Sequence, residues 1–555
     1  MKARCDSLLF VLHLVLLQVV ATLDAPFTLA DLGACASALS PDLLGLLAIA
    51  VLGSAMGQPR RWAHVAAIVL LVSILFRVAQ AMILTHYERA FELADVLSLP
   101  ALLHWWLDDD TQLGRVCKIA GLAVSLCGVQ LLFAWAFAYV ARPARRTRGA
   151  IVWAVALQGI VVAALVNGSS GAAVPLWRVS SLGELASETV RTIEIALDPD
   201  AVDDPIRTRI AEAAEKLAKA PGDLGRLGGA DVHVLIIESY GRVALRQPEL
   251  ARRLETVWQQ LGQDLHAAGF DAMSGACCPS VSGGGSWLSH AELFSAVRVP
   301  EQRTHRLLFR SNLVPLPRHF ADVGYHTVEV MPAQDKHYRL DPRQPGGPED
   351  GSEFYGFEEI ATQLELGYEG TVYHWGRMPD QFALHYLLER VVKPAKRPLF
   401  TAFVSVTSHM AWQMVPPFIS DWRIDANTFA GPAQEEHPCG LLFDPKDPAL
   451  IDAYGDCLEY ALRAAVGFVC RLPRPSLVLL LGDHQPPIAG SVQPPDHTRD
   501  VPIHAFANRR ELLDPCRTIG FVPGCEVPDS VQPFALAAFA PAFLKLYSRG
   551  ATLTK

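Results

Sequence analysis

The sequence predicts a chain of two parts. Residues 1–167 form a helical transmembrane bundle, and residues 231–555 form an α/β domain with a doubly wound, mostly parallel sheet. Long apolar runs are confined to the first part, whereas short β-rich apolar runs alternate with helix-like stretches in the second. The composition agrees, because 51% of the 555 residues are hydrophobic and only 19% are charged. Residues 168–230 are expected to be a juxtamembrane linker.

Five apolar runs predict about five membrane-spanning helices. A bilayer core needs about 17–25 apolar residues per helix, and the third and fourth runs meet this need while the others are shorter. The runs are Leu8–Leu23, Leu43–Gly57, Trp62–Leu84, Ile119–Ala141 and Ala150–Val166. A set of buried core helices is the alternative, but so many long runs so close together favour a membrane. The first run is also compatible with a cleaved signal peptide.

The positions of lysine and arginine predict how these helices are oriented. Basic residues precede the first run and lie between the second and third and between the fourth and fifth, whereas the other loops are acidic. Cytoplasmic loops carry the excess of Lys and Arg, so we expect the N-terminus inside and residues 168–555 outside the cytoplasm. This predicts an integral protein of a bacterial-type inner or plasma membrane, with a periplasmic or extracellular catalytic domain.

The charge of the outer part excludes nucleic acid as its partner. Residues 1–167 hold 12 Lys or Arg and 10 Asp or Glu, whereas residues 168–555 hold 36 and 47, a net charge of −11. Nucleic-acid binding needs a basic surface, which this part lacks.

Seven of the 11 cysteines lie in the outer part, where the compartment permits disulfides. Cys516 and Cys525 are close enough in sequence to close a small loop, so a disulfide between them is one possibility. A zinc-finger site is excluded because the sequence has no pair of CxxC motifs.

The outer domain is expected to alternate buried strands with helices. The predicted strands are Val232–Ile237, His326–Val330, Phe400–Val406 and Leu477–Leu481, with a further strand near 499–503. The predicted helices are Pro248–Ala268, Val314–Val323, Gln381–Val392 and Ala449–Cys470. Continuous apolar strands between helices are typical of a parallel sheet that is covered on both faces. Within the linker, residues 186–220 have helix-like spacing and predict connecting helices along the membrane surface.

Polar clusters follow three of these strands. The first strand runs into Glu238, the third into His409, and the fourth into Asp483 and His484. Ligands bind beyond the carboxyl ends of strands in open α/β sheets, so we expect these side chains to converge. Two carboxylates and one imidazole suit Mn²⁺ or Zn²⁺. Such a cation would bind an anionic substrate and lower the pKa of a coordinated hydroxyl.

A glycine-rich segment, Gly283–Gly285, precedes Ser286. A helix is expected to begin near Ser286, where free backbone N–H groups offer a site for an anion such as phosphate. A hydroxyl at this point suits covalent catalysis if a metal activates it. Serine is also a common helix N-cap, and the local sequence favours neither role.

In this order, the motifs resemble the alkaline phosphatase/sulfatase superfamily. The closest resemblance is to its membrane-anchored branch of lipoteichoic acid synthases, phosphoglycerol transferases and phosphoethanolamine transferases. The motifs are ESYG at Glu238–Gly241, GGGSWLSHAELFSA at Gly283–Ala296, SH at Ser408–His409 and GDHQPP at Gly482–Pro487. The resemblance covers the whole plan of the chain and implies an outer domain of alkaline-phosphatase/sulfatase type.

The resemblance also implies the ligands of a divalent metal, Mn²⁺ or Zn²⁺. The family's acidic ligand after the first strand corresponds to Glu238, and its hydroxyl nucleophile, which also binds metal, corresponds to Ser286. The family's Asp-His pair corresponds to Asp483 and His484. His497 has the spacing of a further histidine that some members carry after this motif.

Substrate contacts are implied for three residues. His409 is expected to contact the transferred group or leaving oxygen and to act as acid or base. Arg339 is a candidate for headgroup binding, although a solvated basic loop is the alternative, and Trp412 is a candidate for lining the site. Sulfatases carry a Cys-x-Pro-x-Arg motif, whereas Val281 stands here in place of the Arg after Cys277, so formylglycine chemistry is not expected.

The expected function is a metal-dependent transferase. It would move phosphoglycerol or phosphoethanolamine from a membrane phospholipid to an envelope glycan or lipid, through an intermediate on Ser286. One alternative is a sulfatase-like hydrolase of phosphate or sulfate esters that uses the same residues. Another is a catalytically silent scaffold of the cell envelope.

Overall fold

The chain forms two compact units in this computed structural model, Met1–Leu84 with Arg89–Pro199 and Thr85–Glu88 with Asp200–Lys555. The structure describes residues 17, 40–87, 89, 91–98, 112–141, 181–334, 354–371, 373, 378–412, 414–425, 427–430, 444–492 and 498–549. The main division, between residues 199 and 200, falls inside the segment that was expected to link the two parts.

The first unit is helical. Its elements are α3 (Pro41–Ala55), α4 (Pro59–Tyr87), η1 (Leu93–Ser98), α6 (Gln112–Val140) and α8 (Ser181–Leu197). Among the described residues, two helical stretches are long and apolar enough to cross a membrane, Pro59–Leu84 with 26 residues and Gly114–Val140 with 27. They correspond to the third and fourth predicted runs, whereas the second run forms α3, which is short for a span at 15 residues. The first and fifth predicted runs lie almost entirely outside the described residues.

Helices α3, α4 and α6 share one apolar core that includes Leu43, Ala66 and Phe137. Other apolar side chains of the two long helices point outward, and Val124 and Leu131 are 71% and 57% exposed. A helix that is apolar on both its packed and its outward side suits contact with lipid.

The second unit is built on one mixed sheet. Over the described residues the strand order is β4-β3-β5-β1-β6-β7-β2-β8, with β9 paired to β2. The strands are β1 (Asp231–Ile237), β2 (Asp271–Cys278), β3 (His326–Val330), β4 (Glu359–Ala361), β5 (Leu399–Val404), β6 (Ser476–Gly482), β7 (Val501–Ala507), β8 (Val522–Pro523) and β9 (Phe534–Ala535). The five strands β4, β3, β5, β1 and β6 are parallel to one another, whereas β7 runs antiparallel to both β6 and β2.

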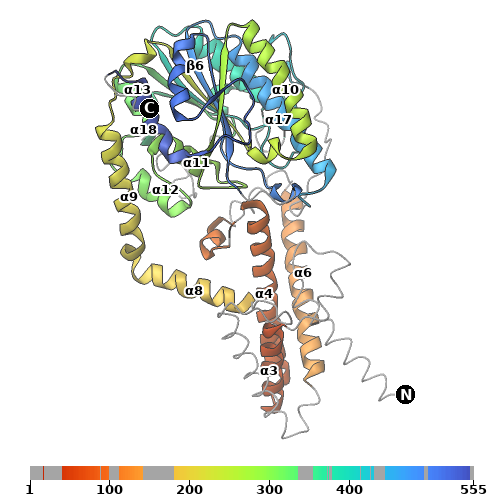
Figure 1. The fold of residues 1–555 in the computed structure, drawn as a ribbon. Helices are drawn as coiled ribbons and strands as arrows, with labels where there is room; N and C mark the ends of the chain where they lie inside the picture. The colour runs from red at the N-terminus through yellow and green to blue at the C-terminus, as the bar shows by residue number, and fades with distance from the viewer. Residues whose placement is uncertain are drawn as a thin grey trace. The chain divides into compact units, whose positions relative to one another are not determined.

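Helices cover both faces of this sheet (Figure 1). The principal helices are α9 (Pro199–Lys219), α10 (Pro248–Ala267), α11 (Ser286–Ser295), α12 (Gln302–Phe309), α13 (Leu316–Asp322), α15 (Gln363–Leu366), α16 (Asp380–Tyr386, continued by a π-helical turn over Leu387–Val392), α17 (Pro448–Val469) and α18 (Phe539–Tyr547). Short 3₁₀ turns occur at Gly225–Leu227, Arg242–Leu245, Ala489–Ser491, Arg510–Leu512, Asp514–Ile519 and Leu536–Ala538.

Strand β1 shows how the two faces are filled. Val234 and Ile236 belong to the core under α11, α13 and α18, whereas Leu235 and Ile237 belong to the core under α10, α16 and α17. Alternate side chains of a strand point to opposite faces, so a strand buried on both faces must be apolar throughout. The prediction of a doubly wound, mostly parallel sheet is confirmed.

Two expectations about this unit were wrong. The strand predicted to reach Val406 ends at Val404, because the Val406 N–H is donated to the Asp380 carboxylate instead of to the sheet. Cys516 and Cys525 are both free thiols, and the Cys516 sulfur lies 3.4 Å from the Tyr547 hydroxyl instead of in a disulfide.

Candidate metal centre

Glu238, Asp483 and His484 meet at the carboxyl ends of two neighbouring strands. Ile237 of β1 pairs with Gly482 of β6, so the next residue on each strand, Glu238 and Asp483, leaves the sheet at the same level. All three side chains are buried, and one ligand atom from each lies within 4.8 Å of the others. The convergence expected from the strand ends is therefore present.

Hydrogen bonds fix the geometry of the cluster. The His484 Nε2 lies 3.3 Å from Glu238 Oε1 and 3.6 Å from Asp483 Oδ2. The Asp483 Oδ1 accepts the backbone N–H groups of Ser239 and His484, each at 2.8 Å. The Ser239 hydroxyl donates to Glu238 Oε1 at 2.9 Å. Both carboxylates are thus oriented by the residues that follow their strands.

The charges of the cluster compensate one another. Burial raises the pKa of Asp483 to about 7, and the nearby charge of Glu238 adds to this effect. Burial would also raise the pKa of Glu238, but the imidazoles of His409 and His484 together hold it below its usual value. For His484, burial lowers the pKa, and the carboxylates Asp483 and Glu238 outweigh burial and raise it to about 9. Two buried acids therefore need a positive partner at this point.

The donor set fits a divalent cation. Among the described residues, the Asp483 Oδ2 is a buried atom without a hydrogen-bond partner. A buried carboxylate oxygen left in this way is costly unless an ion satisfies it. Two carboxylates, one imidazole and a neighbouring hydroxyl are donors that Zn²⁺ and Mn²⁺ accept.

Ser286 stands at the edge of this cluster. It is the first residue of α11, and Gly285 before it has φ +81°, a conformation that residues with a side chain rarely adopt. The Ser286 hydroxyl donates to Glu238 Oε2 at 2.9 Å and lies 3.2 Å from His484 Nε2. The N-cap of α11 is Gly285 and not Ser286, so the alternative that Ser286 is only a helix cap is wrong.

The segment around Ser286 is tied to the sheet edge. The Gly283 N–H donates to the Gln485 carbonyl at 2.9 Å, and the Ser289 hydroxyl donates to the Asp483 carbonyl at 2.6 Å. The buried Glu292 carboxylate accepts backbone N–H groups from Ser280, Val299 and Ala537, each at 3.2 Å. These bonds hold the nucleophile candidate against the residues that follow β6.

His409 is also brought to the centre, on the loop after β5. The Ser408 hydroxyl donates to the Glu238 carbonyl at 2.7 Å, which fixes this loop next to β1. The His409 imidazole is close enough to lower the pKa of Glu238, and its Nδ1 donates to the Met410 carbonyl.

Trp412 differs from expectation. Its side chain is only 1% exposed, its Nε1 donates to the Ser408 carbonyl at 2.8 Å, and its ring packs against Tyr454. This placement supports the loop that carries His409 and does not present the indole to a substrate. The other two predicted site residues, Arg339 and His497, lie outside the described residues.

Sequence reasoning missed several residues of the centre. His290 is buried on α11, and its Nε2 lies 4.0 Å from Asp483 Oδ2. Asp380 anchors the loop of His409 through the Val406 and Thr407 N–H groups. The one available signal for His290 was its position four residues after Ser286, which places both on one face of a helix.

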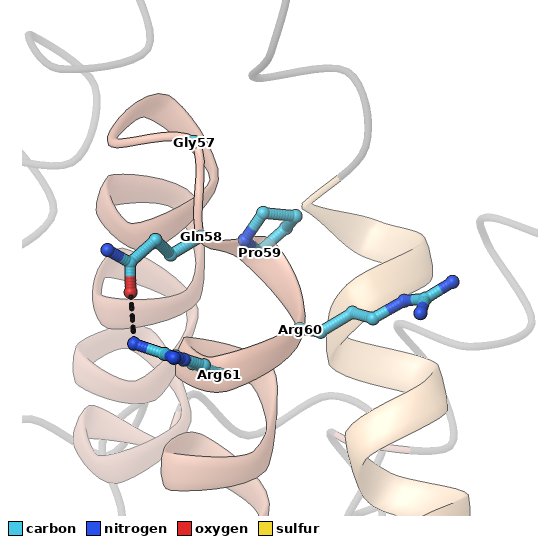
Figure 2. A pocket seen from close by; sticks show the side chains of 5 residues that line it. All are labelled: Gly57, Gln58, Pro59, Arg60 and Arg61. Atoms are coloured by element: carbon cyan, nitrogen blue, oxygen red, sulfur yellow. Dashed lines mark hydrogen bonds between the residues drawn. The ribbon is translucent and has the colours of Figure 1, made fainter.

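A separate hollow lies in the first unit, at the turn between α3 and α4 (Figure 2). It has a volume of about 490 Å³ and is lined by Gly57, Gln58, Pro59, Arg60 and Arg61. The Arg61 guanidinium donates to the Gln58 side chain at 3.3 Å. None of the predicted site residues lines it, so it is distinct from the candidate metal centre.

No family model and no curated protein matches this chain. Three solved structures are similar to it over much of its length. They are the lipoteichoic acid synthase LtaP from Listeria monocytogenes (14% identity over 58% of this chain and 73% of that one, TM-score 0.37), the Streptococcus pyogenes phosphoglycerol transferase GacH in complex with sn-glycerol-1-phosphate (12%, 63%, 88%, 0.37) and the C-terminal periplasmic domain of EcEptC from Escherichia coli in complex with Zn (10%, 58%, 84%, 0.38). These similarities and the sequence motifs point to the same group, the membrane-anchored proteins of the alkaline phosphatase/sulfatase type.

Proposed function

We propose that this protein is a membrane-anchored, metal-dependent transferase. It moves a phospho-linked headgroup, phosphoglycerol or phosphoethanolamine, from a phospholipid to an envelope glycan or lipid. The observation that carries the proposal is the placement of the Ser286 hydroxyl, 2.9 Å from Glu238 Oε2 and 3.2 Å from His484 Nε2 at the start of a helix. The choice of headgroup follows the resemblance of the motifs to phosphoglycerol and phosphoethanolamine transferases.

In the first step, the Ser286 Oγ attacks the phosphorus of the donor lipid. Its proton passes toward the Glu238 carboxylate, to which the hydroxyl already donates. The new Oγ–P bond forms as the P–O bond to diacylglycerol breaks, and His409 gives the leaving oxygen its proton. The backbone N–H groups at the start of α11 face the anionic group that is being transferred.

In the second step, a hydroxyl of the acceptor attacks the phosphorus held on Ser286. His409, which has lost its proton, takes the proton of the attacking hydroxyl. The Oγ–P bond breaks, and Ser286 recovers its proton from Glu238. The headgroup is then attached to the acceptor, and both side chains are restored.

Glu238, Ser286, Asp483 and His484 are the residues that would hold the divalent cation. When bound, this cation supplies charge stabilisation at phosphorus and lowers the pKa of the serine hydroxyl. His497 as a further ligand and Arg339 as a headgroup contact are part of the same proposal. The two long apolar helices give a reason for anchoring, because the donor lipid lies in the bilayer.

Mass analysis of a trapped intermediate tests the proposal. The full-length protein carrying His409→Ala is incubated with Mn²⁺ or Zn²⁺ and a bacterial lipid extract, and intact and peptide masses are measured. We expect a phosphoglycerol or phosphoethanolamine adduct on the Ser286 peptide, and none when Ser286→Ala is added.

Other outcomes separate the alternatives. A bare phosphate- or sulfate-sized adduct on Ser286 would favour a hydrolase. An unmodified Ser286 in a protein that also binds no cation would overturn the proposal and favour an envelope scaffold.

A further inference from the structure

A second imidazole, that of His290, faces the candidate metal centre. His290 lies four residues after Ser286 on α11 and is 7% exposed. Its Nε2 is buried without a hydrogen-bond partner among the described residues, and so is the Asp483 Oδ2. These two atoms are 4.0 Å apart, so two unsatisfied polar atoms meet at the same point.

A cation satisfies both atoms, whereas a direct hydrogen bond does not. A separation of 4.0 Å is too long for a hydrogen bond between nitrogen and oxygen. Imidazole nitrogen and carboxylate oxygen each lie about 2.0–2.2 Å from a bound Zn²⁺, so two ligands of one ion are separated by up to about 4.3 Å. The observed distance falls within this limit.

The position of His290 is fixed independently of any ion. Ser289, its neighbour on α11, donates its hydroxyl to the Asp483 carbonyl at 2.6 Å. Helix α11 is therefore already attached to the residue that would share the cation. Because Ser286 and His290 lie four residues apart, one ion bound to both would also fix the rotation of the helix and hence the direction of the nucleophile.

We propose that the His290 Nε2 is a further ligand of the divalent cation that the Asp483 Oδ2 binds. The ligand set then contains two imidazoles, two carboxylates and the Ser286 hydroxyl. A second nitrogen donor shifts the preference of the site from Mn²⁺ toward Zn²⁺. The inference rests on the proposed function only in requiring a cation at Glu238, Asp483 and His484.

Metal titration of the purified full-length protein tests the inference without any assay of activity. Protein stripped of metal is titrated with Zn²⁺ and with Mn²⁺ by calorimetry, as wild type and as His290→Ala and His290→Gln. We expect both substitutions to weaken Zn²⁺ binding by about 10–100-fold and Mn²⁺ binding by less. The matched control is His233→Gln, because His233 is also a buried histidine with an unpartnered Nε2 but lies within β1.

The visible absorption of bound Co²⁺ distinguishes a ligand from a residue that only supports the site. Loss of a nitrogen ligand changes the ligand-field bands, so we expect His290→Gln to shift the Co²⁺ spectrum and His233→Gln to leave it unchanged. A weaker affinity with an unchanged spectrum would overturn direct ligation. If His290→Ala does not fold in the presence of a chelator, His290→Gln decides by the same criteria.

Failure of this inference differs from failure of the proposed function. If the His290 variants bind Zn²⁺ as the wild type does while Glu238→Gln loses it, the inference is wrong and the metal centre remains. If wild type and all variants bind no divalent cation, the metal dependence of the proposed function fails as well.

Discussion

The hydroxyl of Ser286 is placed by contacts that a helix cap does not need. Its Oγ bonds to a buried carboxylate from one strand end and approaches an imidazole from another. Because the cap itself is Gly285, the side chain of Ser286 is free for chemistry. The role of this residue can therefore be tested by keeping or removing the hydroxyl alone.

We expect Ser286→Ala to lower headgroup transfer by at least about 10³-fold, since no other group can form the covalent intermediate. Ser286→Thr keeps a hydroxyl and should retain transfer within about tenfold of wild type. Release of diacylglycerol from labelled phospholipid measures both. Ser295→Ala is the matched control, a buried serine at the other end of α11 whose hydroxyl accepts only the Val297 N–H. Equal rates for Ser286→Ala and wild type would contradict the covalent role.

Which residues of the centre could be foreseen depends on how they are positioned. Glu238 and Asp483 directly follow apolar strands, and strand ends of a parallel sheet meet at one edge whatever the details of packing. His290 points at Asp483 only because of how α11 is rotated, and that rotation is set by contacts such as Ser289 with the Asp483 carbonyl. A helix sequence contains no information on such partners, so His290 could not be predicted.

At the level of elements, the N-terminus of α16 holds both ends of the loop that carries His409. The Asp380 carboxylate accepts the Val406 and Thr407 N–H groups at 2.7 and 3.1 Å. The Gln381 amide donates to the Ile419 carbonyl at 2.8 Å and accepts the Ile419 N–H at 2.9 Å. The loop after β5 is thus positioned by a helix that contributes no side chain to the metal cluster.

Asp380→Asn should therefore impair transfer without affecting metal binding. The amide replaces one acceptor by a donor that faces a backbone N–H, so the His409 loop loosens, and we expect transfer to fall by about 10–100-fold. Zn²⁺ affinity should stay within about twofold, because the cluster comes from the ends of β1 and β6. Asp447→Asn is the control, since Asp447 caps α17 at the surface. A parallel loss of metal binding would show that Asp380 supports the whole site instead of the loop.

Strand β3 carries a buried acid whose titration affects stability. Burial raises the pKa of Glu329 to about 8, above its ordinary value of 4.5. The folded protein then keeps this proton up to about pH 8, whereas the unfolded chain loses it near pH 4.5. The free energy of unfolding should therefore fall as the pH rises from about 4.5 to 8.

Glu329→Gln should remove this dependence and raise stability at pH 8 by on the order of a few kcal/mol. Denaturant unfolding at pH 5 and pH 8 measures the difference. Glu255→Gln on the exposed surface of α10 provides the comparison, and it should leave the pH dependence of wild type intact. An unchanged slope in Glu329→Gln would show that another group is responsible.

Strands were predicted where their composition is distinctive. His326–Val330 was predicted with the bounds that it has in the structure, because it is short, apolar and flanked by helices. Strand β2 was not predicted, since DAMSGACC consists mostly of small residues that are uncommon in strands. It is held in the sheet by pairing with β7, a long-range contact that local composition does not reveal.

For the whole molecule, the division into a helical unit and an α/β unit followed from hydropathy, but the order of strands did not. The sheet places β1 between β5 and β6, which are more than 160 residues later in the chain. Such crossovers depend on how the connecting helices pack on the two faces. The position of Glu238 beside Asp483 is a direct result of this topology, because only neighbouring strands bring their ends together.

The orientation of the chain in the membrane is the prediction on which an outward-facing reaction depends. Arg60 and Arg61 lie in the turn before α4, and such basic turns are retained on the cytoplasmic side. In a background with Cys117→Ser and Cys127→Ser, which removes two exposed thiols, Gln58→Cys should react with a membrane-impermeant maleimide only after permeabilisation. A cysteine at Glu212, on the exposed side of α9, should react in intact spheroplasts. The reverse pattern would place the catalytic unit inside the cytoplasm and remove the envelope acceptor from its reach.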